Sequence, residues 1–143
     1  GSGFMVAPGY LCTNFHVIER AYTLQDNVKQ VKTLIDQLAG NATNFLPEDL
    51  VNASKEYLLE KLSPTFEDLP EVYVRINSST KYQKCRIVDV EPDLDLCLLK
   101  VEEGGDTDVE ETVSFGSSSD LLVGQTVVAI GNPFGLDKTV TTG

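Results

Sequence analysis

The sequence has a single histidine, His16, no tryptophan, and three cysteines at positions 12, 85 and 97. No two cysteines have the CxxC spacing that is typical of zinc ligands, and structural zinc sites need four Cys or His ligands. A structural zinc site is therefore not expected. Cys12 and Cys97 lie inside apolar runs, where a free thiol packs as a small hydrophobic side chain. We interpret all three cysteines as structural.

Basic residues are also scarce, with 11 Lys and Arg against 22 Asp and Glu and a formal net charge of -11. Nucleic-acid binding depends on neutralising phosphates with cationic side chains, so no nucleic-acid partner is expected. No apolar run approaches the roughly 20 residues that span a bilayer, so no membrane span is expected. The hydrophobic fraction of 41% over 143 residues is enough for the core of an ordinary domain.

Short apolar and β-branched runs separated by turn residues predict a mainly β fold. FMVA and YLCT occur near the start, VYVRI, KCRIVDV and LCLLKV between residues 71 and 101, and TVVAIG and TVTTG near the end. Runs of this length with polar punctuation are typical of antiparallel strands and hairpins. Because GSGFMVA reads as a strand already under way, we expect the chain to be part of a longer protein.

Residues 22–70 interrupt this β pattern with helical periodicity. In LQDNVKQVKTLIDQLAG, apolar residues recur at spacings of three and four, which predicts a helix that ends at Gly40. PEDLVNASKEYLLEKLSP predicts a second helix that begins near Pro47 and ends at Pro64. We therefore expect an inserted α-helical hairpin whose apolar stripe packs on the β body or on a partner subunit.

His16 becomes a candidate catalytic residue because of a possible acidic partner. It follows the predicted strand YLCT and starts a turn, a position where a scaffold can present a side chain. Asp95 begins the apolar run LCLLKV, so its half-buried carboxylate needs a hydrogen-bond donor. An imidazole N–H is a suitable donor, and the second ring nitrogen stays free to take a proton from a hydroxyl. Asp93 and, less favourably, Asp89 remain alternative acids.

Three segments together resemble the DegP/HtrA family of trypsin-like serine proteases: GSGFMVAPGYLCTNFHVIERA, DLDLCLLKVE and SDLLVGQTVVAIGNPFGLDKTVTTG. The resemblance covers everything except residues 22–70. It implies a trypsin-like antiparallel double β-barrel and an ATP-independent serine endopeptidase that degrades unfolded or damaged proteins. The domain organisation that it implies is a first barrel at 1–21 and 71–101, a helical insertion at 22–70, a connector at 102–111 and the start of the second barrel at 112–143.

By this resemblance, His16 matches the general base of the family's TN-x-HV motif and Asp95 matches the orienting acid. The family's nucleophile lies in a GNSGGP motif that this sequence lacks. The serines at 117–119 are not substitutes, because a nucleophile elbow needs flanking glycines and backbone N–H groups turned toward the oxyanion. We expect this chain alone to be inactive. One alternative is a noncatalytic protease-like β-barrel that acts as a binding or chaperone module. Another is a structural or interaction domain whose helical hairpin is the working surface and in which His16 has no catalytic role.

The resemblance also carries expectations about cofactors, partners and compartment. It implies no metal or cofactor, polypeptide substrates, and a trimer-based homo-oligomer for the full-length protein. Family members work in the periplasm, mitochondria and plastids, so an organelle lumen or the periplasm is favoured over the cytoplasm. The helical insertion at 22–70 follows the histidine directly, and we expect it to influence assembly or access to the site.

Overall fold

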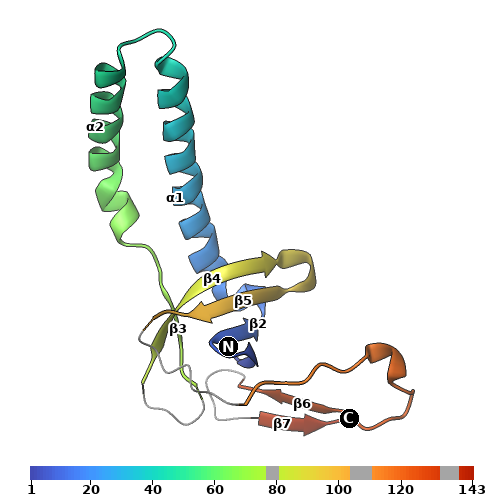
Figure 1. Cartoon of the computed structure of the whole chain (residues 1–143). Coiled ribbons are helices and arrows are strands. Elements are labelled where there is room, and N and C mark those ends of the chain that lie inside the picture. The colour runs from blue at the N-terminus through green and yellow to red at the C-terminus, as the bar shows by residue number, and fades with distance from the viewer. Residues whose placement is uncertain (77–80, 104–110, 133–138) are drawn as a thin grey trace. The chain divides into compact units, whose positions relative to one another are not determined.

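The computed structural model describes residues 1–76, 81–103, 111–132 and 139–143, and Figure 1 shows its elements. These residues divide into two compact units, one formed by Gly1–Ile18 with Glu71–Gly143 and the other by Glu19–Pro70. The first unit holds the strands, which are β1 (Gly3–Ala7), β2 (Tyr10–Thr13), β3 (Val72–Val74), β4 (Gln83–Glu91), β5 (Leu96–Val101), β6 (Val128–Gly131) and β7 (Thr139–Thr142). The long helices are α1 (Phe15–Ala42) and α2 (Glu48–Glu67), and the short 3-10 helices are η1 (Pro92–Leu94) and η2 (Ser118–Asp120).

Five antiparallel strands form one sheet in the order β1-β2-β5-β4-β3. Gly9, with φ of 74°, lies between β1 and β2, where a left-handed backbone conformation lets the chain reverse direction. Figure 1 shows β2, β5 and β4 side by side, although β2 and β5 are far apart in the sequence. The pairing of β2 with β5 places Thr13, the last residue of β2, opposite Cys97 near the start of β5.

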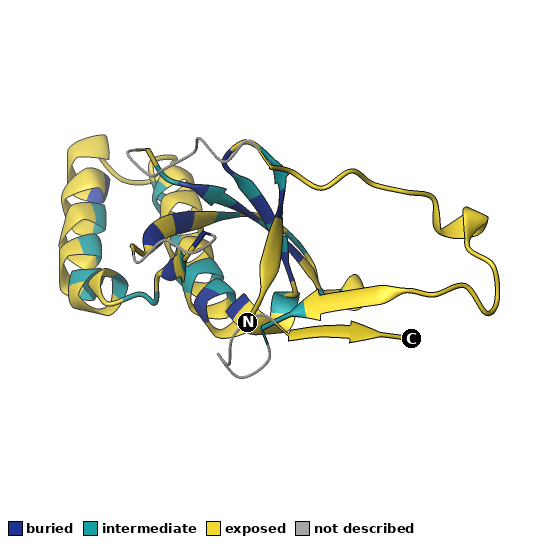
Figure 2. Ribbon diagram, turned by 90° about the horizontal axis from the view of Figure 1, so that it is seen from below, coloured by how far each residue is buried: buried dark blue, intermediate teal, exposed yellow. Residues whose placement is uncertain are grey.

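The core of this sheet follows from strict alternation along β5. Its buried side chains, Cys97, Leu99 and Val101, share one face because successive residues of a strand point to opposite sides. Leu99 is 2% exposed and lies between Leu11 of β2 and Ile87 of β4. Figure 2 shows buried residues along the strands of this sheet, whereas the pair β6 and β7 is largely exposed.

All three cysteines are free thiols, and two of them belong to the core. Burial raises the pKa of Cys85 to about 11, and burial likewise raises the pKa of Cys97 to about 11. A thiol with so high a pKa is protonated at neutral pH and is a poor nucleophile. Cys85 and Cys97 therefore behave as small hydrophobic residues of the sheet.

The remaining strands, β6 and β7, form a separate antiparallel pair with Val128 opposite Thr142. The backbone N–H of Val113, which precedes this pair, donates to the carbonyl of Met5 in β1 at 2.9 Å. Most of the expected connector at 102–111 and most of GNPFG lie outside the described residues.

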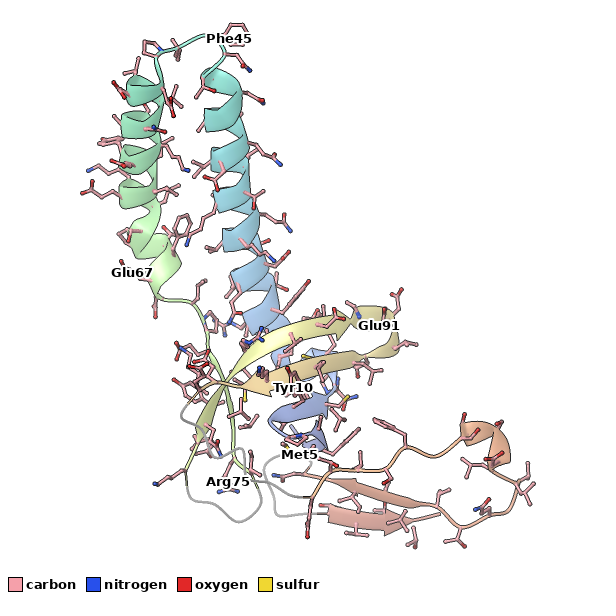
Figure 3. The ribbon with its side chains drawn as sticks, in the orientation of Figure 1. Met5, Tyr10, Phe45, Glu67, Arg75 and Glu91 are labelled. Carbon is pink, nitrogen blue, oxygen red and sulfur yellow. The ribbon has the colours of Figure 1, made fainter. Side chains whose placement is uncertain are left out.

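Glu19–Pro70 is the helical hairpin that the sequence predicts, and Figure 1 shows its two helices running antiparallel. Two contacts join the helices: Lys55 pairs with Asp36 at 2.7 Å, and the ammonium of Lys32 lies 4.9 Å from the ring centroid of Phe66. Phe45, labelled in Figure 3 at the turn between the helices, is 88% exposed.

Much of the predicted apolar stripe of the hairpin is exposed in the structure. Its most exposed members in the first helix are Leu24, Val31, Leu34 and Leu38. None of the helices in the described ranges combines the length and the apolar character that crossing a membrane requires.

Two predicted helix ends differ from the structure. Helix α1 continues through Gly40 to Ala42, because Gly40 does not adopt the left-handed backbone conformation that commonly ends a helix. The Gly40 carbonyl accepts the Thr43 hydroxyl at 2.7 Å beyond the last turn. Helix α2 likewise continues past Pro64 to Glu67, and the Ser63 hydroxyl donates to the Glu67 carboxylate at 2.6 Å across that turn. A proline removes one helical hydrogen bond, and here the helix tolerates this loss near its end.

The predicted turn at His16 is also wrong, because His16 lies in the first turn of α1. The first N–H groups of a helix have no partner within the helix and need an outside acceptor. Asp95 supplies two: its main-chain carbonyl accepts the N–H of Phe15 at 3.1 Å, and its carboxylate accepts the N–H of His16 at 2.9 Å. A contact that is distant in the sequence thus starts the helix directly after β2.

Truncation of Leu99 tests whether the alternation along β5 carries the stability of the sheet. Leu99→Ala should lower the free energy of unfolding by about 2–5 kcal/mol, because it removes buried methyl groups and leaves a cavity. Urea denaturation followed by circular dichroism measures this change. Leu122→Ala is the matched control, since Leu122 is 76% exposed, and an equal loss in both variants would contradict the assignment of the core.

Candidate catalytic site

The site forms where β2 ends and β5 begins, next to each other in the sheet. Asp95 lies between η1 and β5 in a left-handed backbone conformation, with φ of 53° and ψ of 44°. Its N–H donates to the carbonyl of Pro92 at 3.0 Å, which closes the turn after Glu91, the residue labelled at the end of β4 in Figure 3. Aspartate tolerates this conformation better than most residues do. The turn aims the Asp95 carboxylate at the start of α1.

The structure brings together the two residues that the sequence suggested. His16 Nδ1 lies 2.8 Å from Asp95 Oδ2, and the backbone N–H of His16 donates to Asp95 Oδ1 at 2.9 Å. The side chains are 67% exposed for His16 and 45% exposed for Asp95. A carboxylate beside Nδ1 favours the tautomer that carries its proton on Nδ1, so that Nε2 has a free lone pair. In the described ranges, Nε2 makes no hydrogen bond and is open to solvent.

The hydrogen bonds from His16 hold the pKa of Asp95 below its ordinary value of 3.8. The backbone N–H of His16 has the largest effect, followed by its imidazole, while partial burial opposes both and Asn14 adds a smaller lowering. Asp95 is therefore an anion at neutral pH and acts as an acceptor toward the imidazole.

A third residue, Asn14, also contacts Asp95, although the sequence alone did not indicate it as a site residue. Asn14 Nδ2 donates to the main-chain carbonyl of Asp95 and to Asp95 Oδ2, both at 3.2 Å. The available signal was its place in TNFHV, two residues before the histidine. Spacing alone does not show that its side chain reaches a residue 81 positions away.

Neither alternative acid contacts the histidine. Asp89 lies in β4, is exposed, and accepts the N–H of Val90 at 2.9 Å. Asp93 lies in η1 and is exposed. Among the described residues, the ring of His16 donates its hydrogen bond to Asp95 and not to either of these two carboxylates.

The serine cluster at 117–119 lies in and beside η2. Ser117 and Ser119 hydroxyl oxygens are 2.5 Å apart, and both residues are exposed. They bond to each other and not to His16. Across the described ranges, no group of three or more His, Cys, Asp or Glu side chains has the arrangement of a metal site.

The sequence and the fold of this chain are similar to those of known proteins. The family described as "Trypsin-like peptidase domain" matches residues 1–143. "Probable periplasmic serine endoprotease DegP-like" from Chlamydia trachomatis serovar D is 36% identical over 77 residues, which cover 54% of this chain and 14% of that protein. "Protease Do-like 5, chloroplastic" from Arabidopsis thaliana is 31% identical over 145 residues, which cover 100% of this chain and 32% of that protein.

A solved structure, "Crystal structure of Deg5", has a TM-score of 0.53 and 29% identity, with 100% of this chain and 50% of that chain covered. The chain therefore belongs to the DegP/HtrA family of trypsin-like serine proteases. The predicted fold class is confirmed: a curled antiparallel sheet with two helices forms part of a trypsin-like barrel. The chain spans 14% and 32% of the lengths of the two curated relatives named above.

Carboxyl ¹³C NMR of Asp95 during a pH titration tests the electrostatics of the site. The Asp95 resonance should titrate below pH 3.8 in the folded chain. Because this folded-state pKa is lowered, the contacts stabilise the fold above the unfolded-state pKa, and this stabilisation is lost as the pH falls through the folded-state pKa.

His16→Ala is the informative control for that titration. It removes the imidazole donor and keeps the backbone N–H, which has the larger effect, so the pKa of Asp95 should rise toward 3.8 without reaching it. A titration of Asp95 at or above 3.8 in the unsubstituted chain would contradict the hydrogen bonds described above.

Proposed function

We propose that His16 and Asp95 are the general base and the orienting acid of a serine endopeptidase. The observation that carries the proposal is the 2.8 Å contact between His16 Nδ1 and Asp95 Oδ2, combined with an exposed imidazole. Membership of the DegP/HtrA family supports it, because one of the named relatives is described as a serine endoprotease and the other as a protease. The nucleophilic serine and the donors to the oxyanion would come from the remainder of a longer protease.

In the proposed reaction, Nε2 of His16 takes the proton from the serine hydroxyl as its oxygen attacks the peptide carbonyl. The imidazolium that forms is stabilised by the Asp95 carboxylate, which also keeps the ring in the required tautomer. His16 then gives the proton to the leaving amine, and the peptide bond breaks. The remaining acyl-enzyme is hydrolysed when His16 takes a proton from a water molecule that attacks the ester carbonyl and then returns that proton to the serine oxygen, which frees the second product.

The proposed substrates are unfolded or damaged polypeptides, in keeping with the resemblance to DegP/HtrA proteases. The names of the relatives refer to the periplasm and to chloroplasts, so we propose the periplasm or an organelle lumen as the working compartment. The trimer-based assembly of the full-length protein stays a prediction.

Substitution of His16 in the full-length protein tests the proposed chemistry. His16→Ala should lower kcat on an unfolded protein substrate by about 10⁴-fold or more, and Asp95→Asn by about 10⁴-fold, because each removes a member of the triad. Proteolysis assays measure the loss, and circular dichroism and size-exclusion chromatography check folding and assembly.

Two outcomes would contradict this reading in different ways. Proteolysis that survives in His16→Ala removes this residue from the mechanism. A folded full-length protein that hydrolyses no polypeptide before any substitution would instead support a noncatalytic binding or chaperone module.

We further propose that the helical unit Glu19–Pro70 is an insertion that controls assembly or substrate access. The side-chain amide of Gln25, in the first part of the hairpin, donates to the carbonyl of Pro70, its last residue, at 2.7 Å. The chain therefore enters and leaves the hairpin at nearby points. Phe45 and Leu46 in its turn and Leu50 at the start of α2 are exposed apolar side chains. A segment with closely spaced ends and an exposed apolar tip is suited to contacting another polypeptide.

Replacement of residues 23–69 by a short Gly/Ser linker in the full-length protein tests the role of the insertion. Cleavage of a short peptide should persist, because His16 and Asp95 lie outside the deleted range. The oligomeric state or the range of protein substrates should change. A matched variant, Phe45→Ser with Leu46→Ser, keeps the length of the hairpin and removes much of its apolar tip. An unchanged oligomeric state and an unchanged substrate range in the deletion variant would contradict the proposal.

A further inference from the structure

One amide group reaches both the main chain and the side chain of Asp95. The two N–H bonds of Asn14 Nδ2 are directed to the Asp95 carbonyl oxygen and to Asp95 Oδ2, at 3.2 Å each. A neutral amide nitrogen has two donor hydrogens, so both can be used at once.

The acceptors of Asp95 are satisfied by three consecutive residues. Oδ1 accepts the N–H of His16 at 2.9 Å, and Oδ2 accepts from His16 Nδ1 at 2.8 Å and from Asn14. The main-chain carbonyl accepts the N–H of Phe15 at 3.1 Å and the second donor of Asn14. Rotation of the Asp95 carboxylate therefore breaks its hydrogen bonds to His16 and Asn14 together. The hydrogen bonds to the main-chain carbonyl of Asp95 also fix the left-handed backbone conformation of this residue.

Helix capping alone does not explain this use of Asn14. Asparagine directly before a helix usually accepts a hydrogen bond from the second or third N–H through its side-chain oxygen. Here Asn14 directly precedes α1, yet its side-chain nitrogen donates to Asp95, and the first helical N–H groups bond to Asp95 instead. The side chain of Asn14 thus serves the carboxylate rather than the helix.

We propose that Asn14 is a positioning residue that holds Oδ2 of Asp95 toward Nδ1 of His16. The inference rests on the proposed function, since it assigns a residue to the same site. Asn14 touches neither the substrate nor the reacting atoms in this scheme. It acts through Asp95, which needs an oriented carboxylate to fix the imidazole tautomer.

Asn14→Asp in the full-length protein separates positioning from helix capping. Asp and Asn are about equally good residues at the start of a helix, so this change should leave thermal stability and circular dichroism nearly unchanged. The new carboxylate loses both donors and places a like charge beside Asp95, which should turn the Asp95 carboxylate away. We expect kcat to fall about 10- to 100-fold, the effect of losing hydrogen bonds to a charged group, with KM unchanged.

Two further variants complete the kinetic experiment. Asn14→Ala removes the donors without adding a charge, and its kcat should fall less than that of Asn14→Asp. Asn27→Asp makes the same chemical change at an exposed position of α1 and should leave kcat unchanged. Full kcat in both Asn14 variants overturns the inference, and so does an equal loss of kcat in Asn27→Asp.

The tautomer of the single histidine gives a readout that a purely structural role would not move. The ¹⁵N resonances of the imidazole in this 143-residue chain belong to His16 alone. At a pH where the ring is neutral, the proton should reside on Nδ1 in the unsubstituted chain, and Asn14→Asp should shift the population toward the Nε2-protonated form. An unchanged tautomer population in Asn14→Asp overturns the inference.

The failure of this inference is distinguishable from the failure of the proposed function. If His16→Ala abolishes proteolysis and Asn14→Asp does not reduce it, the general base stands and the positioning role falls. If His16→Ala retains proteolysis, the proposed function falls, and a positioning role for Asn14 toward that chemistry falls with it.

Discussion

The carboxylate of Asp95 is the group on which the local structure of the site depends, because its three hydrogen-bond donors all lie on one short segment, Asn14 to His16. One oxygen accepts the first-turn N–H of His16 at 2.9 Å, and the other lies 2.8 Å from the imidazole of the same residue. The positive end of a helix favours a carboxylate, and an imidazole N–H donates to one. The Asp95 carboxylate therefore determines both where α1 begins and how the imidazole of His16 is oriented.

The register of the sheet places that anion. Thr13 opposite Cys97 brings the residues that follow β2 next to those that precede β5. This register is fixed by burial, since Leu11 and Leu99 face each other in the core and a slip of β2 by one residue would turn Leu11 toward the opposite face. The apolar core thus determines the distance between two polar side chains that lie 79 positions apart in the sequence.

The sequence predicted the parts of the fold that depend on local patterns. The short apolar run LCLLKV identified β5, and the spacing of apolar residues after position 22 identified the helical hairpin. It also suggested Asp95, because a carboxylate next to a buried run needs a donor. It did not predict the start of α1 at Phe15 or the contacts of Asn14. Both depend on Asp95 as a distant hydrogen-bond acceptor, and the pattern of residues 13–18 alone does not indicate that partner.

Stability and activity should depend on different residues in this chain. His16 and Asp95 are 67% and 45% exposed, and a polar pair that is so exposed contributes little to the free energy of folding because water screens the interaction. The sheet is held instead by side chains such as Leu99 and Cys97, each 2% exposed. The same partial exposure that makes the pair weak for stability leaves Nε2 within reach of a hydroxyl from elsewhere in a protease. A site at the end of two strands can therefore remain accessible while the register behind it stays rigid.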